Sequence, residues 1–269
     1  MKARIFLLLL LSFVGFSGGS LWASDLQDVL NRGKIVAIGF PHQESQFIRP
    51  DLDALRAFGG PLAKLRDGSA YRGIDIEILQ AVAERLGVAL EVSPILTSYV
   101  DLIPALLRGE GHVLVSGLTI TEEREKVLDF STPYLEGWIV VGASPGNDIK
   151  SVEHLHGLRA AVMRGSSHHE FLLGRDIPDF ELVLTDYIIE NNVLLEDGKV
   201  DVALFDSWAE VGQPIRGRTT SIEVALRLQA FDYGLAVRPD SDLLAPMAEV
   251  IEELRQSGEM RRILARHEH

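Results

Sequence analysis

The sequence predicts an α/β protein built from two lobes. Short apolar segments of strand length alternate with amphipathic helical segments, which is the pattern of sheets covered by helices. The alternation runs from residue 34 to 116 and starts again at residue 160. Two units of roughly 100 residues each fit the length of 269 residues. Because no low-complexity linker separates them, we expect two lobes joined by short crossing strands.

The first unit has a clear order of elements. Strands are expected over 34–39, 88–92 and 113–116. Between the first two, apolar residues recur at helical spacing up to residue 86, and Gly87 ends the helix. A second helix is expected from residue 102 to 107. This order favours a parallel sheet covered on both faces, while residues 48–72 fit no clean element.

The second unit repeats the alternation of strands and helices. Strands are expected over 160–163, 181–184 and 202–205, and a helix precedes the third of them and ends near Gly198. A late strand is expected over 233–237. Ser241 is the expected N-cap of a final helix that ends at Gly258.

Residues 1–23 have the composition of a secretory signal peptide. Lys2 and Arg4 give a positive start, and an uncharged apolar run over 5–19 leads to the small residue Ala23. The alternative, a membrane anchor, needs a span of ~20 apolar residues, and this run is shorter. We therefore expect cleavage near Ala23 or Ser24 and a mature protein in the periplasm.

Charge and cysteine content exclude several classes of protein. The net charge is −13, and it becomes −15 without Lys2 and Arg4. An acidic surface argues against binding to nucleic acid or to anionic membranes, since both need a basic face. The absence of cysteine excludes disulfides, thiolate catalysis and lipid attachment through an N-terminal cysteine.

Polar residues follow three of the predicted strands, in segments 116–124, 164–167 and 205–207. Open α/β sheets bind ligands at the carboxyl ends of their strands. Arg124 offers a planar fork that matches a carboxylate, and Asp206 can accept from an ammonium group. Taken singly, Arg124 could form a surface ion pair and Asp206 could cap a helix. Together the three segments indicate a site for a zwitterion.

Several motifs resemble the periplasmic solute-binding protein family 3, the polar amino-acid receptors of ABC transporters. They occur in the order found in that family, and they cover nearly all of the chain after residue 70. The combination of SGLTITEER and DFSTPY is the specific part. The matching segments are 73–76 (GIDI), 83–87 (AERLG), 102–106 (LIPAL), 116–124 (SGLTITEER), 129–134 (DFSTPY), 165–167 (GSS), 198–203 (GKVDVA) and 233–237 (YGLAV).

The resemblance implies a type II periplasmic binding protein, or Venus flytrap, with a central cleft and two hinge strands. One lobe would comprise residues 24–134 and 234–269, and the other residues 139–229. The crossings would lie near residues 134–138 and 230–233.

The resemblance also implies the role of each site residue. Arg124 and Thr119 would bind the ligand α-carboxylate from the first lobe. Ser166 and Ser167, at the start of a helix whose dipole favours an anion, would bind it from the second lobe. The ligand ammonium group is assigned to Asp206, Ser116 and Gly117.

The sequence departs from the family pattern after the first strand. Glu44 stands where an aromatic residue usually covers the ligand, and Pro41 stands at the usual acidic position. An additional segment follows over 48–71. Glu44 either suits a ligand with a donor or cationic side chain or points to solvent. The expected side-chain pocket comprises Glu44, Tyr99, Met163 and His168.

The function implied is an extracytoplasmic receptor that closes on a free amino acid and delivers it to an ABC permease. The lobes would close because the ligand's charges are paired only when both lobes contact it. Two alternatives on the same fold stay open: a sensor for a signalling partner, and a lyase similar to cyclohexadienyl dehydratase, with Glu44 and His168 as acid and base.

Other chemistries have little support in the sequence. His168 and His169 are adjacent, so on a helix they point apart and make poor joint metal ligands. No H-E-x-x-H motif is present. Ser166 and Ser167 stand beside His168, but adjacent residues at a helix start rarely have the geometry of a nucleophile and its base. We expect no metal, no cofactor, no catalytic residue and a monomeric protein.

Overall fold

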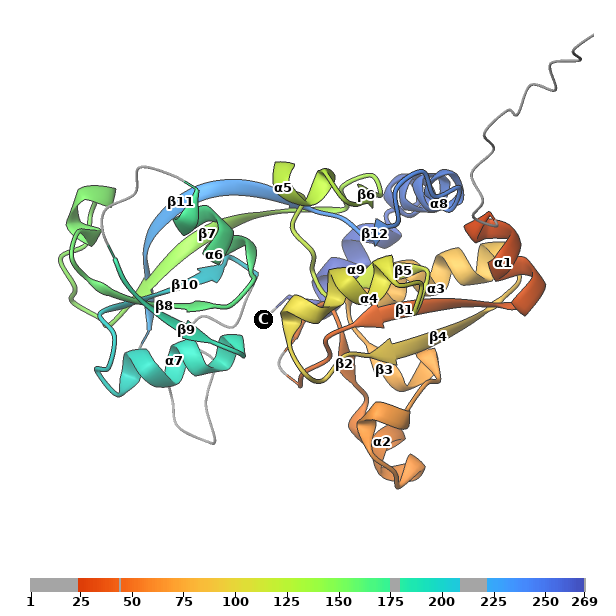
Figure 1. Ribbon diagram of the computed structural model, residues 1–269, viewed down its shortest axis with the longest axis horizontal. Helices are drawn as coiled ribbons and strands as arrows, with labels where there is room; N and C mark the ends of the chain where they lie inside the picture. The colour runs from red at the N-terminus through yellow and green to blue at the C-terminus, as the bar shows by residue number, and fades with distance from the viewer. Residues whose placement is uncertain (1–23, 44, 175–179, 209–221, 269) are drawn as a thin grey trace, which may run out of the picture.

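The computed structural model describes residues 24–43, 45–174, 180–208 and 222–268, and these form two five-stranded sheets and one two-stranded sheet. The two large sheets lie in separate halves of the molecule (Figure 1). The predicted signal peptide lies outside the described residues. The prediction of α/β units in two halves agrees with this arrangement.

The first sheet has the order β4-β1-β5-β12-β6. The strands β1 (Lys34–Gly39), β4 (Ala89–Pro94) and β5 (Val113–Val115) are parallel, as predicted. However, β12 (Ala236–Val237) runs antiparallel to β5 and to β6 (Asp129–Phe130). The sheet is therefore mixed, because the three predicted strands are parallel and β12 joins them in the opposite direction.

Helix α3 shows how the sequence pattern becomes packing. It spans Ile74–Leu86, and Ile78, Leu79 and Val82 on its inner face are fully buried. Gly87 ends it in a left-handed conformation with φ of 68°. Outside residues 48–72, the other described helices of this half are α1 (Asp25–Arg32), η3 (Tyr99–Asp101), α4 (Leu102–Leu107), α5 (Glu122–Glu125), α8 (Leu244–Gln256) and α9 (Glu259–His267).

The start of helix α8 differs from the prediction. Its N-cap is Leu243 rather than Ser241. The Ser241 hydroxyl donates instead to Asp25, at 2.6 Å from Oδ2. A tertiary contact with the first helix therefore uses the side chain that the sequence pattern assigned to a local cap.

Residues 48–72 contain regular structure that the sequence reading missed. A two-stranded sheet pairs β2 (Arg49–Pro50) with β3 (Tyr71–Arg72), and α2 (Leu52–Phe58) lies between them in the chain. Asp51 caps α2 by accepting from the Ala54 N–H at 2.8 Å. Two short 3₁₀ turns follow, η1 (Leu62–Lys64) and η2 (Gly68–Ala70). This segment forms the lower edge of the right-hand half in Figure 1.

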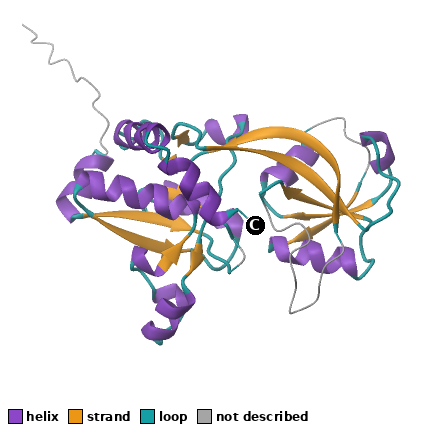
Figure 2. Ribbon diagram, turned by 180° about the vertical axis from the view of Figure 1, so that it is seen from behind, coloured by secondary structure: helices purple, strands orange, loops and turns teal. Residues whose placement is uncertain are grey.

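The second sheet has the order β11-β7-β10-β8-β9. Strands β8 (Arg159–Met163), β9 (Glu181–Thr185) and β10 (Val202–Asp206) are parallel, close to their predicted positions. Strands β7 (Leu135–Ala143) and β11 (Glu223–Tyr233) are antiparallel additions. The helices of this half are η4 (Val152–Leu155), α6 (Ser167–Leu173) and α7 (Ile188–Glu196), seen from behind in Figure 2.

The long pair β7 and β11 links the two halves. It extends from Leu135 opposite Tyr233 to Ala143 opposite Glu223, with two shifts in register. Both strands curve from the second sheet toward the first (Figure 1). The predicted strand over 233–237 comprises the end of β11 and the whole of β12. The predicted lobe boundaries and hinge segments stay predictions.

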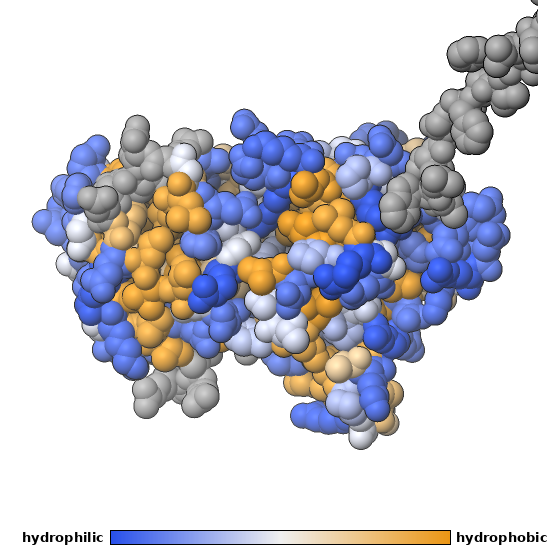
Figure 3. Space-filling model, viewed as in Figure 1, coloured by the Kyte–Doolittle hydropathy of each residue, from blue (hydrophilic) through white to orange (hydrophobic). Residues whose placement is uncertain are grey.

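Apolar and hydrophilic side chains are unevenly spread on the face seen in Figure 3. Apolar side chains gather on the left half and toward the middle, and hydrophilic ones cover the right-hand edge. Among the described residues, no helix combines the length and the apolar character needed to span a membrane.

Candidate functional site

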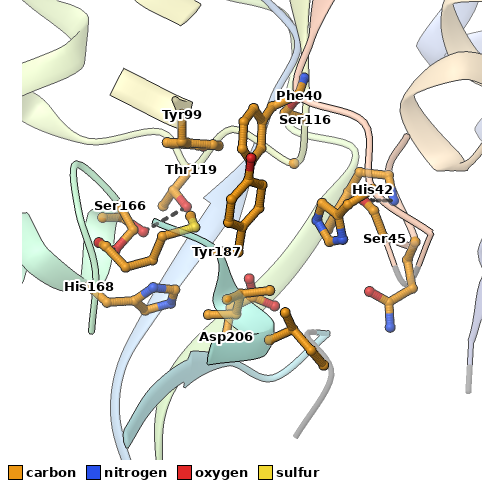
Figure 4. A pocket seen from close by; sticks show the side chains of 17 residues that line it. Phe40, His42, Ser45, Tyr99, Ser116, Thr119, Ser166, His168, Tyr187 and Asp206 are labelled. Atoms are coloured by element: carbon orange, nitrogen blue, oxygen red, sulfur yellow. Dashed lines mark hydrogen bonds between the residues drawn. The ribbon is translucent and has the colours of Figure 1, made fainter. Parts of the chain in front are cut away.

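A cavity of about 210 Å³ lies between the two halves and draws its walls from both. The first half contributes residues that follow β1, β4 and β5, and the second half contributes residues at or just after the ends of β8, β9 and β10. Its lining residues are Phe40, His42, Ser45, Gln46, Phe47, Tyr99, Ser116, Gly117, Thr119, Met163, Ser166, Ser167, His168, Tyr187, Ile188, Ile189 and Asp206 (Figure 4).

The fully buried Asp75 fixes the loop after β5. Its Oδ2 accepts from the N–H groups of Ser116 at 2.8 Å and Gly117 at 2.9 Å. Its other oxygen accepts from the Tyr134 hydroxyl. Burial raises the pKa of Asp75 to about 6, although these three bonds favour the charged form. The carboxylate therefore holds two cavity-lining residues in place.

Gly117 is required where this loop meets Phe47. Its φ is 61°, and a Cβ built on it would lie 2.4 Å from the Phe47 ring. Phe47 itself packs on Tyr233, with 4.8 Å between ring centroids. A larger residue at this position would displace the ring that forms one wall of the cavity.

Contacts between protein side chains cross the cavity from one half to the other. The hydroxyl oxygens of Thr119 and Ser167 are 3.0 Å apart and share a hydrogen bond. The rings of Phe40 and Tyr187 stack with 5.4 Å between centroids, and Tyr99 meets Phe40 edge-on at 6.0 Å. The two halves are therefore in direct contact on both polar and aromatic sides.

Arg124 lies beside the cavity but is not among the described residues that line it. Only 3% of the residue is exposed. Its Nη1 donates to the Thr119 carbonyl at 3.0 Å and its Nη2 to the Gly165 carbonyl at 3.3 Å. Its Nε is 3.3 Å from Oε1 of Glu170. The guanidinium thus bridges the two halves and already has a carboxylate partner.

The start of helix α6 uses the Ser166 hydroxyl locally. Ser166 is the N-cap, as the sequence pattern predicts, and it accepts from the His169 N–H at 3.2 Å. The same hydroxyl donates to the Met163 carbonyl at 2.7 Å. Ser166 therefore shapes the turn, whereas the neighbouring Ser167 directs its hydroxyl to Thr119.

Asp206 stands at the end of β10 and lines the cavity. Its Oδ1 accepts from the Trp208 N–H at 2.9 Å. Burial and the nearby charge of Asp206 together raise the pKa of the Tyr233 hydroxyl well above its ordinary value. The carboxylate is thus a negative charge at the floor of the cavity.

His168 is buried, with 5% of the residue exposed. Among the described residues, neither ring nitrogen has a hydrogen-bond partner. Burial, reinforced by the positive charge of Arg124, lowers its pKa to about 3, so the ring is neutral. In Figure 4 the ring points toward the side chains of Asp206 and Tyr187.

The structure brings together nine of the eleven residues predicted from the sequence. Those that line the cavity are Tyr99, Ser116, Gly117, Thr119, Met163, Ser166, Ser167, His168 and Asp206. Arg124 lies beside it, and Glu44 is outside the described residues. The sequence reading missed Phe40, His42 and Tyr187, although Phe40 directly follows β1 and Tyr187 follows β9. The rule that ligands bind at strand ends could have found both aromatic residues.

No group of three or more potential metal ligands converges within the described part of the chain.

Two curated relatives are similar in sequence to about three quarters of this chain. The probable histidine-binding protein of Neisseria gonorrhoeae is 28% identical over 218 residues, which cover 77% of this chain and 78% of the relative. The L-cystine-binding protein TcyJ of Escherichia coli K12 is 28% identical over 208 residues, or 74% of each chain.

An enzyme is also among the relatives. The membrane-bound lytic murein transglycosylase F of Idiomarina loihiensis is 30% identical over 216 residues. The match covers 77% of this chain but only 47% of the transglycosylase.

Solved structures share the fold. A structure of a mutant of arginine-bound ArgBP from T. maritima superposes with a TM-score of 0.68 at 27% identity, covering 85% of this chain and 99% of the ArgBP chain. An amino-acid ABC transporter substrate-binding protein from Streptococcus pneumoniae has a TM-score of 0.75 at 24% identity, with 91% and 98% covered. The two-lobed fold of type II periplasmic binding proteins is thereby confirmed.

The family model described as bacterial extracellular solute-binding proteins, family 3, matches residues 60–268. This match covers well over half of the chain. With relatives that bind amino acids and a cavity lined by both lobes, it confirms the resemblance seen in the motifs. The chain belongs to family 3 of the bacterial extracellular solute-binding proteins.

Proposed function

We propose that this protein binds one free amino acid in the cavity between its lobes and delivers it, outside the cytoplasm, to an ABC permease. The observation that carries the proposal is that hydroxyl, carboxylate and aromatic side chains of both lobes line one cavity. The relatives named as histidine-binding and cystine-binding proteins support the same ligand class.

Arg124, Thr119 and Ser167 are proposed to hold the ligand α-carboxylate. A guanidinium has five N–H donors, and each terminal nitrogen of Arg124 carries a second N–H besides the one bound to a carbonyl. The hydroxyls of Thr119 and Ser167, which now bind each other, can both turn toward a carboxylate. Charge-assisted bonds of this kind are worth roughly twice a neutral hydrogen bond.

Asp206 is proposed to hold the α-ammonium group. It is the charged residue among the described lining residues, and it lies across the cavity from the hydroxyl pair. An ammonium group that leaves water needs a partner of this kind. The negative charge also disfavours ligands that are purely anionic.

Binding and lobe closure are proposed to be coupled. The residues proposed to bind the ligand α-carboxylate come from both lobes, whereas Asp206, proposed to bind the ammonium group, belongs to the second lobe. A ligand therefore gains its full set of contacts only when the lobes meet, so it favours the closed form by its differential affinity. The permease would recognise that form.

Isothermal titration calorimetry of the mature protein against the twenty common amino acids tests the proposal. We expect heat from one of them or a close group, with the ligand recovered unchanged by mass spectrometry. Arg124→Ala should weaken binding at least 100-fold, because it removes a charged partner worth several kcal/mol. Arg124→Lys should recover only part of the affinity, because lysine lacks the planar fork.

The matched control is Arg227→Ala, which removes an exposed arginine from β11 in the second lobe. It should leave affinity unchanged. The thermal midpoint of each variant separates loss of binding from loss of folding. An absence of binding to any amino acid by the wild-type protein would overturn the proposal. Unchanged affinity of Asp206→Ala for the amino acid that binds would show that Asp206 does not hold its ammonium group.

A further inference from the structure

His168 is a polar side chain of the cavity wall that has no hydrogen-bond partner in the part of the chain that the structure describes. Only 5% of the residue is exposed, and both ring nitrogens lack a partner among the described residues. Its neighbours differ in this respect, since Ser166, Ser167 and Asp206 each bind another protein group. Buried polar atoms are nearly always paired, so an exception in a cavity wall points to a missing ligand group.

The ring offers one donor and one acceptor. Burial and the charge of Arg124 hold the pKa of His168 at about 3, so the imidazole is neutral across the physiological range. A neutral imidazole carries one N–H and one lone pair. A group that satisfies both must itself present an acceptor and a donor.

Ionised ligand side chains do not meet this requirement. An ammonium or guanidinium group offers donors only, and a carboxylate offers acceptors only, so either would leave one nitrogen of His168 unpaired. An uncharged group that both donates and accepts can pair both nitrogens.

We propose that His168 selects the ligand by its side chain, and that the ligand is an amino acid whose side chain ends in an uncharged group that both donates and accepts hydrogen bonds, as a carboxamide does. This inference rests on the proposed function. It deepens it by naming the class of amino acid and the residue that reads it.

The expected selectivity follows from the cost of unpaired polar atoms. The side chain of L-methionine is close in length to that of L-glutamine, but it carries no N–H donor and its sulfur is only a weak acceptor. In its place, the two nitrogens of His168 would stay buried and unpaired. One lost hydrogen bond corresponds to roughly tenfold in affinity, so the wild type should prefer L-glutamine over L-methionine by roughly 10- to 100-fold.

Competition calorimetry with L-glutamine, L-methionine, L-arginine and L-glutamate tests this inference. His168→Leu removes both nitrogens and keeps an apolar side chain of similar bulk. We expect it to lower the preference for L-glutamine over L-methionine by at least tenfold, chiefly through weaker binding of L-glutamine. The control is His154→Leu, the same substitution at an exposed site of the second lobe, which should leave the preference unchanged.

The outcomes separate this inference from the proposed function. If no amino acid binds the wild type, the proposed function itself fails. If amino acids bind but His168→Leu keeps the wild-type preference, or if L-arginine or L-glutamate binds best, the proposed function stands and the role of His168 is wrong. Circular dichroism of each variant confirms that the comparison is made between folded proteins.

Discussion

Asp75 is the residue whose single carboxylate ties the cavity to the strand pair that links the lobes. One oxygen holds the N–H groups of Ser116 and Gly117, and the other accepts from Tyr134, directly before β7. Its pKa is about 6 in the folded protein, against an ordinary value of 3.8. Between these values the folded state holds a proton that the unfolded state has lost.

Stability should therefore fall as pH rises through this window. Each pKa unit corresponds to ~1.4 kcal/mol, so Asp75 should lower the free energy of unfolding by roughly 3 kcal/mol between about pH 4 and about pH 6. Asp75→Asn, which cannot ionise, should lack this loss. Urea denaturation of both proteins from pH 4 to pH 7 measures the difference.

Carboxylates with lowered pKa values, such as Glu77 and Asp201, act in the opposite direction but equally in both proteins. The difference between variant and wild type isolates Asp75. If the difference in free energy of unfolding between Asp75→Asn and the wild type were the same at pH 4 and pH 7, ionisation of Asp75 would not set the pH dependence of stability.

At the residue scale, the sequence predicted cavity residues that are placed by the end of a nearby strand. It did not predict contacts between residues far apart in the chain. Thr119 and Ser167 follow strands, Asp206 is the last residue of one, and all three line the cavity. The Glu170 partner of Arg124 and the stacking of Phe40 on Tyr187 join residues far apart in the chain. Such pairs depend on how the two lobes meet, which periodicity along the chain does not encode.

Helix α7 places the aromatic wall of the second lobe. The Glu190 carboxylate accepts from the N–H groups of Asp186 at 2.9 Å and Tyr187 at 3.3 Å. These bonds satisfy donors at the helix start, and they fix the turn from which Tyr187 reaches Phe40. The geometry of this helix start therefore bears on the cavity as well as on stability.

Glu190→Ala should lower the free energy of unfolding by about 1 kcal/mol, the usual cost of a lost helix cap. It should also weaken ligand binding, because Tyr187, Ile188 and Ile189 line the cavity. Glu196→Ala, on an exposed site of the same helix, should change neither quantity. Thermal denaturation and calorimetry measure the two effects, and equal behaviour of the two variants would contradict this role.

At the element scale, helices and strands with strong periodicity were predicted closely, for example α4 and β1. The pair β7 and β11 was foreseen only as crossing segments, because its length comes from pairing between the strands rather than from a pattern within each. Helix α2 was missed because Gly59 and Gly60 follow its seven residues so closely.

The whole molecule is held in its present shape partly by protein bonds across the cavity. Glu170 in the second lobe binds Arg124 in the first, with the Glu170 side chain one-third exposed. A partly exposed ion pair contributes at most about 1 kcal/mol, enough to shift an equilibrium between open and closed forms severalfold. Removing this carboxylate should therefore favour the open form when no ligand is added.

Fluorescence energy transfer between the lobes measures the shift. The chain has no cysteine, so Arg56→Cys and Lys150→Cys give two unique labelling sites. In that background, Glu170→Ala should lower transfer in the absence of ligand and match the parent protein at ligand saturation. Glu223→Ala, an exposed carboxylate on β11, is the control. Equal transfer in both variants would show that the ion pair does not influence closure.

The bond between Thr119 and Ser167 joins two protein atoms, so the protein can form it with or without cargo. Under the proposed function, an unloaded receptor that closes in this way presents the permease with a closed form similar to that of the loaded receptor. Each such encounter risks a cycle of ATP hydrolysis that imports nothing. The strength of this hydrogen bond therefore affects how much ATP the transporter hydrolyses for each amino acid that it imports. The bond between the two hydroxyls should be weak relative to the bonds that the amino acid forms.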